Sequence, residues 1–146
     1  MSFARISALA VAGIFVIGVS AASFADDMAD PVTARIELMK ENGKALKAAF
    51  SASGDQAVTL AQELVDDFAK LGDLFPEGST GPNSHALPNI WTDSAGFSDA
   101  LTKAQDATAA LLVAAKAGDA AAYSAAAKSV GGTCKNCHDT FRAPIN

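Results

Sequence analysis

Apolar side chains recur in alternating steps of three and four residues along four segments of this chain, which constrains its fold more than any other feature. The segments run from Asp30 to Phe50, from 55 to 75, from Asp93 or Ser94 to Gly118, and from Asp119 to Phe141. Such steps place the apolar residues on one stripe of an α-helix, and helices with such stripes pack at about 20° to one another. We therefore predict an all-α fold, a four-helix bundle.

Each predicted helix has its own set of inward-facing positions. The first helix is expected to begin with Asp30 as its N-cap and Pro31 at the first helical position. The positions predicted to face the core are Val32, Ile36, Met39, Gly43, Leu46 and Phe50; then Ala61, Leu64, Phe68, Leu71 and Phe75; then Phe97, Leu101, Ala104, Thr108, Leu111 and Ala115; and finally Tyr123, Ala127, Val130, Cys134, Cys137 and Phe141.

The connections between the segments predict the topology of the bundle. The breaks at 51–54 and at Gly118 are short, so the first helix should run antiparallel to the second and the third antiparallel to the fourth. The long link 73–92 must cross between these two hairpins. We expect it to be ordered, because it carries Ile90 and Trp91, which are apolar enough to pack.

The motif Cys134-Lys135-Asn136-Cys137-His138 has the spacing of a covalent haem attachment site. Two thiols three residues apart can each add to a haem vinyl group, and the adjacent imidazole then becomes the proximal ligand of the iron. The alternatives are a disulfide or dithiol redox pair, which does not need the histidine, and half of a zinc site. Zinc requires about four ligands, and outside the motif only His85 is left among the soft or imidazole donors.

Cys134 and Cys137 fall on the predicted inward stripe of the fourth helix, and His138 shares their side of it. The sequence thus predicts an antiparallel bundle with one covalently attached haem c per chain in its core. Because the haem would be part of the core, the apoprotein is expected to be poorly folded.

Residues 1–25 have the composition of a secretory signal peptide, with Arg5, an apolar stretch at 6–19 and a small-residue cleavage pattern ending at Ala25. We predict that cleavage leaves one domain, residues 26–146, in the periplasm, because c-type haem attachment is completed outside the cytoplasm. The alternative is a retained anchor, but the stretch is short of the roughly 20 apolar residues that span a bilayer. We expect no stable membrane insertion after cleavage.

The charge of the chain narrows the choice of partners. Cleavage would remove one basic and no acidic residue and change the formal net charge from −5 to −6. An acidic protein of this kind is not expected to bind nucleic acid or an anionic membrane. Three basic residues recur every seven residues along the fourth helix, namely Lys128, Lys135 and Arg142. They form either a docking stripe for an acidic redox partner or an ordinary solvated face.

The second face of the iron has Met39 as its main candidate ligand, since Met39 is the only methionine on a predicted inward stripe. The first and fourth helices both line the core, so Met39 can meet the haem opposite His138. Its alternative role is core filling, for which methionine is well suited. His85 lies in the polar part of the crossing link, where a histidine is usually solvated.

Three further residues are candidates for haem contact. Arg35, one turn before Met39, can hold a haem propionate, or can form a surface pair with Glu37 or Glu41. Phe141 is expected to pack on the haem edge. Arg142 is expected to contact a propionate or the C-terminal end of its helix.

These residues resemble class II c-type cytochromes, the cytochrome c′ and cytochrome c-556 family, over nearly the whole of residues 26–146. The resemblance rests on Val130-Gly131-x-x-Cys134-x-x-Cys137-His138-Asp139-x-Phe141-Arg142, Arg35-x-x-x-Met39-Lys40, Leu74-Phe75-Pro76-Glu77-Gly78-Ser79 and Pro88-x-Ile90-Trp91. It implies a periplasmic monohaem protein, often a homodimer built from the first two helices.

The resemblance also implies two functions, which differ at Met39. In the c-556 type, which this chain resembles in Leu38-Met39-Lys40-x-Asn42-Gly43-Lys44, methionine is the sixth ligand of an electron carrier that serves periplasmic redox partners. In cytochromes c′ the iron is five-coordinate and binds small gases such as nitric oxide. We predict electron transfer with Met39 as ligand, and gas binding is the alternative. An enzyme is not expected, because the sequence places no general acid or base near the second face.

Overall fold

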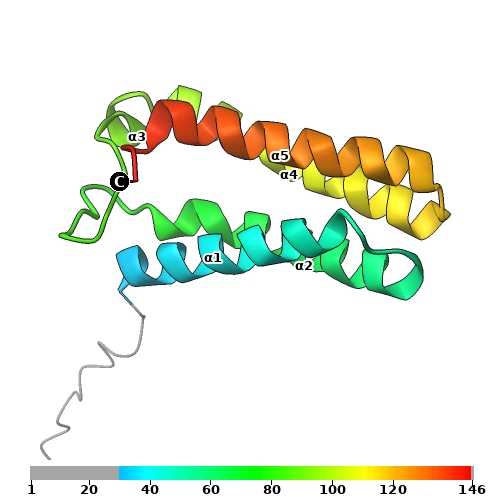
Figure 1. Cartoon of the computed structure of the whole chain (residues 1–146). Helices are drawn as coiled ribbons and strands as arrows, with labels where there is room; N and C mark the ends of the chain where they lie inside the picture. The colour runs from blue at the N-terminus through cyan, green and yellow to red at the C-terminus, as the bar shows by residue number, and fades with distance from the viewer. Residues whose placement is uncertain (1–29, 146) are drawn as a thin grey trace, which may run out of the picture.

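The computed structural model describes residues 30–145, and the predicted signal peptide lies outside this range. The long helices are α1 (Pro31–Ala49), α2 (Gly54–Leu71), α4 (Ser94–Ala117) and α5 (Ala120–Phe141). They form two antiparallel hairpins, α1 with α2 and α4 with α5, packed into a four-helix bundle (Figure 1). The predicted all-α fold and its topology are confirmed.

Local side chains fix the helix ends where the sequence predicted them. The Asp30 carboxylate accepts hydrogen bonds from the backbone N–H groups of Val32 (3.4 Å) and Thr33 (3.1 Å), with Pro31 following as expected. Asp119 caps α5 in the same way through the N–H of Ala122 (2.9 Å). Gly118 ends α4 with a φ of +68°, in the left-handed region that favours glycine.

The crossing link is ordered, as expected. It contains the 3₁₀ turn η1 (Gly72–Leu74) and the short helix α3 (Asn89–Thr92), in which Ile90 is buried. The Trp91 indole donates to the carbonyl oxygens of Phe75 and Pro76, both at 3.1 Å. The link also pairs with the end of α5 and the residues after it, because Leu87 N–H donates to Phe141 O (3.0 Å) and Ala143 N–H donates to His85 O (2.7 Å).

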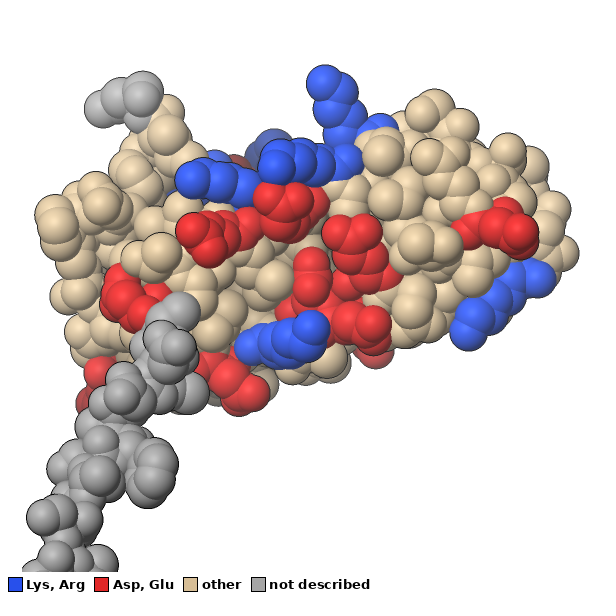
Figure 2. All heavy atoms as spheres, turned by 90° about the horizontal axis from the view of Figure 1, so that it is seen from below, with Lys and Arg blue, Asp and Glu red and all other residues tan. Residues whose placement is uncertain are grey.

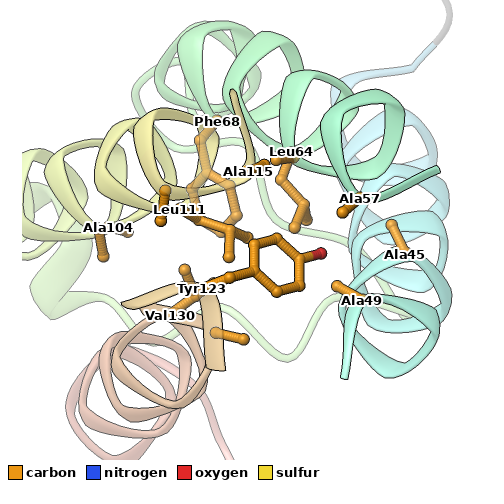
Figure 3. Packing of buried hydrophobic residues seen from close by; sticks show 14 of the residues in the cluster. Ala45, Ala49, Ala57, Leu64, Phe68, Ala104, Leu111, Ala115, Tyr123 and Val130 are labelled. Atoms are coloured by element: carbon orange, nitrogen blue, oxygen red, sulfur yellow. The ribbon is translucent and has the colours of Figure 1, made fainter. Parts of the chain in front are cut away.

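The core is built largely from alanine (Figure 3). Small side chains let the helix backbones approach closely, and a few larger residues, Leu64, Phe68, Leu111, Tyr123 and Val130, fill the space between them. The predicted inward positions of α2, α4 and α5 agree with this core. Ala61, Leu64, Phe68, Leu71, Ala104, Thr108, Leu111, Ala115, Tyr123, Ala127, Val130 and Phe141 are buried.

The predicted inward face of α1 is partly wrong. Gly43 and Phe50 are exposed, Phe50 at 56%, and the buried positions beyond Val32 are Arg35, Asn42, Ala45 and Ala49. The inward stripe is thus rotated by about one residue from the apolar one. The prediction failed because two polar residues and two alanines occupy the inward positions. Such a composition is typical of a solvent-exposed helix face.

Helix–helix contact is uneven around the bundle. The α4–α5 pair makes the most extensive contact, followed by α2–α4 and α1–α2, whereas α1 and α5 touch little. These two helices therefore form the opening of the bundle.

Candidate functional site

A cavity of about 990 Å³ lies at the end of the bundle where α1 begins and α5 ends. Its walls come from α1, α2, the crossing link, α4 and α5, which explains why α1 and α5 touch so little. Its apolar lining includes Ile36, Met39, Phe68, Leu71, Phe75, Ile90, Phe97, Leu101 and Phe141. The volume is at the upper end of that of ordinary small-ligand pockets, about 300–1,000 Å³.

Cys134, Cys137 and His138 line this cavity from the last two turns of α5. Both cysteines are half-buried free thiols, and Cys134 packs against the hydrophobic core. Within residues 30–145, no three His, Cys, Asp or Glu side chains gather into a group able to hold a metal ion. The disulfide and zinc alternatives therefore find no support in this part of the chain.

Burial sets the protonation of the motif. It raises the pKa of the Cys134 thiol, and it raises the pKa of the Cys137 thiol together with the neighbouring Cys134, against the positive charge of Arg142. Burial also lowers the pKa of His138, as does Arg142, with Asp139 acting in the opposite direction. The site thus favours two neutral thiols and a neutral imidazole, the form of histidine that coordinates a metal.

Met39 lies where the sequence placed it. Its half-buried side chain lines the same cavity as His138 and also packs against the hydrophobic core. Helices from opposite ends of the chain therefore meet around one cavity. The arrangement brings a thioether and an imidazole to one cavity, and ligation of iron by Met39 stays a prediction.

Arg35 is buried, with 4% of its surface exposed, and it binds the crossing link. Its Nη1 donates to Leu74 O (3.0 Å) and Ser79 Oγ (2.9 Å), and its Nη2 to Ser79 O (2.6 Å) and Ser84 Oγ (2.8 Å). Its guanidinium also lies 4.8 Å from the centre of the Phe75 ring. The surface pair with Glu37 or Glu41 is contradicted, while the predicted propionate contact stays a prediction.

An aromatic row forms one wall of the cavity. Phe97 packs edge-on against Phe75 (ring centroids 5.0 Å apart) and against Phe141 (5.4 Å). Phe141 was predicted to pack at the haem edge, and it does line the cavity. The roles of Phe75 and Phe97 in the wall were missed, although both fall on predicted inward stripes.

Arg142 also lines the cavity, and its buried Nε has no hydrogen-bond partner in the described chain. An orphaned donor beside a large apolar space fits an anionic group such as a haem propionate. Together with the thiols and the imidazole, this donor makes the cavity suitable for a covalently held haem.

The predicted basic stripe does not form a row of three free cations. Arg142 is half-buried in the cavity wall, and Lys135 pairs with Asp139. Lys128 is exposed about two helical turns before Lys135. His85 is exposed at the cavity rim, as expected for a loop histidine.

Residues 30–142 match the profile of the family described as Cytochrome C′. The chain is 38% identical to cytochrome c′ of Rhodopseudomonas palustris over 141 residues, 91% of this chain and 93% of that protein. It is 36% identical to cytochrome c′ of Rhodospirillum rubrum over 113 residues, 77% and 76% of the two chains. It is also 31% identical to cytochrome c-556 of R. palustris over 147 residues, 90% and 93% of the two chains.

Solved structures agree with this match. The nitric oxide complex of a leucine-to-alanine variant of cytochrome c prime from Alcaligenes xylosoxidans superposes with a TM-score of 0.75 at 28% identity. The alignment covers 80% of this chain and 95% of that one. A ferrous arginine-to-lysine variant of the same protein with bound nitric oxide gives a TM-score of 0.73 at 28% identity over the same shares.

Proposed function

The chain belongs to the cytochrome c′ family, which binds one covalently attached haem c per chain, and on this premise we propose that it binds small gases such as nitric oxide. Cys134 and Cys137 would hold the haem, and His138 would be the proximal ligand. Met39 would cover the second face of the iron without ligating it.

The attachment follows from the chemistry of the motif. Cys134 and Cys137 would each add S–H across one vinyl group, the sulfur forming a thioether and the proton ending on the other vinyl carbon. His138 needs no further deprotonation to donate its nitrogen lone pair, because burial keeps it neutral. The bound haem supplies the gas-binding iron.

The observation that carries gas binding is the packing of Met39. Its side chain contacts the hydrophobic core as well as the cavity, which suits a residue that fills space over an open iron. An apolar wall also suits a neutral diatomic molecule. The relatives add support, because two similar solved structures are nitric oxide complexes.

Electron transfer is the second candidate function. It is favoured by one observation, namely that the sulfur-bearing side chain of Met39 and the His138 imidazole line the same cavity. Met39 and His138 would then both hold the iron, and thioether coordination by Met39 would raise its reduction potential.

Optical spectra separate the two functions. The purified holoprotein is measured oxidised and reduced, with and without carbon monoxide, beside Met39→Ala and Met39→Leu. Leucine removes the sulfur but keeps most of the volume, so it distinguishes ligation from space filling.

Gas binding predicts a high-spin spectrum in the unmodified protein that changes with carbon monoxide, and the Met39→Leu spectrum should match it. The contrary result is a low-spin spectrum unaffected by carbon monoxide that becomes gas-reactive in both variants. That result would make Met39 the sixth ligand and the protein an electron carrier.

We also propose a periplasmic location and periplasmic redox partners. The signal-like composition of residues 1–25 supports the location, although it lies outside the described residues. Among the helices that the structure describes, none is long and apolar enough to cross a bilayer. Fractionation of cells expressing the full chain tests the location, and recovery of the haem protein with the cytoplasmic fraction would contradict it.

The face made by α1 and α2 supports a homodimer, which we propose as the oligomeric state. Figure 2 shows basic and acidic side chains gathered side by side on this face. Exposed Lys44 and Lys47 come from α1, and exposed Glu63 and Asp66 come from α2. A two-fold axis can bring the basic helix of one copy against the acidic helix of the other.

A further inference from the structure

We propose that Arg35 is a positioning residue that holds residues 77–84 closed as a wall of the haem cavity. The inference rests on the haem binding proposed above and adds a role for a side chain of α1. It differs from a direct propionate contact, because Arg35 would act on the haem through the segment that it binds.

The hydrogen bonds of residues 77–84 point to this role. Their backbone hydrogen bonds are local, such as Ser79 N–H to Pro76 O (3.0 Å) and Ser84 N–H to Gly81 O (2.9 Å). Within residues 30–145, every long-range hydrogen bond to this segment comes from the Arg35 guanidinium. Arg35 also binds Leu74 O just before the segment.

The burial of residues 77–84 is consistent with this role of Arg35. Within 77–84 only Ser79 and Ser84 are partly buried, and these are the two residues whose side chains accept from Arg35. The residues between them are exposed, and the stretch contains no large apolar side chain that packs into the core. Hydrogen bonds to Arg35 would therefore hold this segment in place, as apolar packing does elsewhere in the chain.

The position of the segment makes its closure relevant to the haem. Thr80, Gly81, Pro82 and Asn83 line the cavity and are exposed. In this proposal they are the part of the cavity wall that limits access of water. Opening of the segment would admit water to the haem edge, and water stabilises the more highly charged oxidised iron.

The chemistry of Arg35 suits a residue that holds a loop segment in place. A buried guanidinium stays charged, and its rigid fork can bind several acceptors at once. Its acceptors here are two serine hydroxyls and two carbonyls, and the charge is further stabilised by the Phe75 ring. A lysine at this position would keep the charge but lose the fork.

The test uses one variant that releases the segment without touching Arg35 and one that changes Arg35 itself. The holoprotein is compared with the double variant Ser79→Ala/Ser84→Ala, with Arg35→Lys, and with Ser124→Ala as a matched serine control, which is exposed on α5 and does not line the cavity. Amide hydrogen exchange of residues 77–84 and the midpoint potential of the haem are both measured.

The double variant should exchange at least about tenfold faster in this segment, since it loses two of the three bonds from Arg35 to it. Its midpoint potential should fall, Arg35→Lys should shift both quantities in the same direction, and Ser124→Ala should change neither.

Unchanged exchange and potential in the double variant would overturn the proposal, and a potential shift in Arg35→Lys alone would assign Arg35 to direct haem contact. Faster exchange with an unchanged potential would also overturn it, because the segment would then not shield the haem. These readouts do not require carbon monoxide binding, so failure of the proposed gas-binding function remains a separate result.

Discussion

Tyr123 places a phenol hydroxyl inside the alanine-rich part of the core. Its ring is directed from α5 toward Ala45, Ala49 and Ala57 (Figure 3), and the hydroxyl is buried with no hydrogen-bond partner in the described chain. Burial of an unpaired hydroxyl costs about 1–3 kcal/mol. Burial also raises the pKa of Tyr123 above the ordinary value of 10.0.

The variant Tyr123→Phe is therefore expected to be as stable as the unmodified holoprotein at pH 7, or more stable by up to about 2 kcal/mol. Because the pKa of the Tyr123 phenol is raised in the folded state, the phenol ionises first in the unfolded chain. The folded protein therefore loses stability as the pH rises above 10. The variant should lose less stability than the unmodified protein between pH 9 and about 11.

Urea unfolding at each pH measures this difference. A variant destabilised by more than about 1 kcal/mol at pH 7 would show that the hydroxyl is paired, for example through a buried water.

Burial affects the protonation of the three residues of the haem motif. Cys134, Cys137 and His138 are all kept neutral by burial in the same cavity wall. Neutral thiols are slow nucleophiles, since the thiolate is the reactive form. Burial in the cavity wall therefore disfavours the thiolate form of both cysteines.

At the scale of the helix, close approach depends on alanine at the contact positions. Ala61 is fully buried on α2, whereas Ala69 on the same helix is exposed. We expect Ala61→Leu to lower the free energy of unfolding by about 1–3 kcal/mol, because the extra carbons have no space in a packed core. Ala69→Leu should change it by less than about 0.5 kcal/mol.

Thermal or urea unfolding of the two holoproteins compares the variants directly. Equal stability of the two variants would mean that α2 can move away from its neighbours and that the close helix packing is not required.

The helices could be predicted from sequence because the apolar period agreed with local signals at several helix ends. Asp30, Asp93 and Asp119 cap helices where the apolar period begins, and Gly118 ends one in the left-handed conformation. The inward face of α1 could not be predicted, because Arg35 is buried by acceptors that come from a loop some 40 residues away in sequence. Side-chain type alone gives no sign of such partners.

The candidate site was predictable where covalent chemistry fixes the spacing. Cys134, Cys137 and His138 are recognised by their intervals, and the period of α5 turns them toward the interior. The aromatic wall and the segment 77–84 depend on how the crossing link folds. That link has no period, so its contribution becomes visible only in the structure.

For the whole molecule, a cavity of about 990 Å³ in a chain of this size predicts dependence on the haem. An unfilled apolar cavity lowers the stability of the fold, because every side chain around it loses packing contacts. The double variant Cys134→Ala/Cys137→Ala, produced without haem, should retain helical far-ultraviolet circular dichroism but lose near-ultraviolet signal and melt at a lower temperature.

The holoprotein measured in parallel is the control for this comparison. Equal near-ultraviolet spectra and equal melting temperatures of the two proteins would show that the bundle is complete without the haem.

The proposed homodimer makes a prediction at the same scale. Lys47 is exposed on the charged face of α1, and Lys116 is an exposed lysine at the end of α4. We expect Lys47→Glu to raise the dimer dissociation constant by about tenfold at low salt, since it places like charges across the interface. Lys116→Glu should leave it unchanged.

Sedimentation equilibrium of both variants and the unmodified holoprotein gives these constants. A monomeric unmodified protein, or equal weakening by the two substitutions, would remove α1 and α2 from the interface.

The weak contact between α1 and α5 has a consequence for how the chain reaches its native state. The extensive pairings, α1–α2, α4–α5 and α2–α4, each join two long helices with no other long helix between them in the chain. Contact order is therefore low, and bundles of this type fold in microseconds to milliseconds. The pairing of α1 with α5, which requires closure of the longest loop, contributes little contact. The slow step in making this molecule is therefore expected to be the formation of the covalent bonds to the haem and not the search for topology.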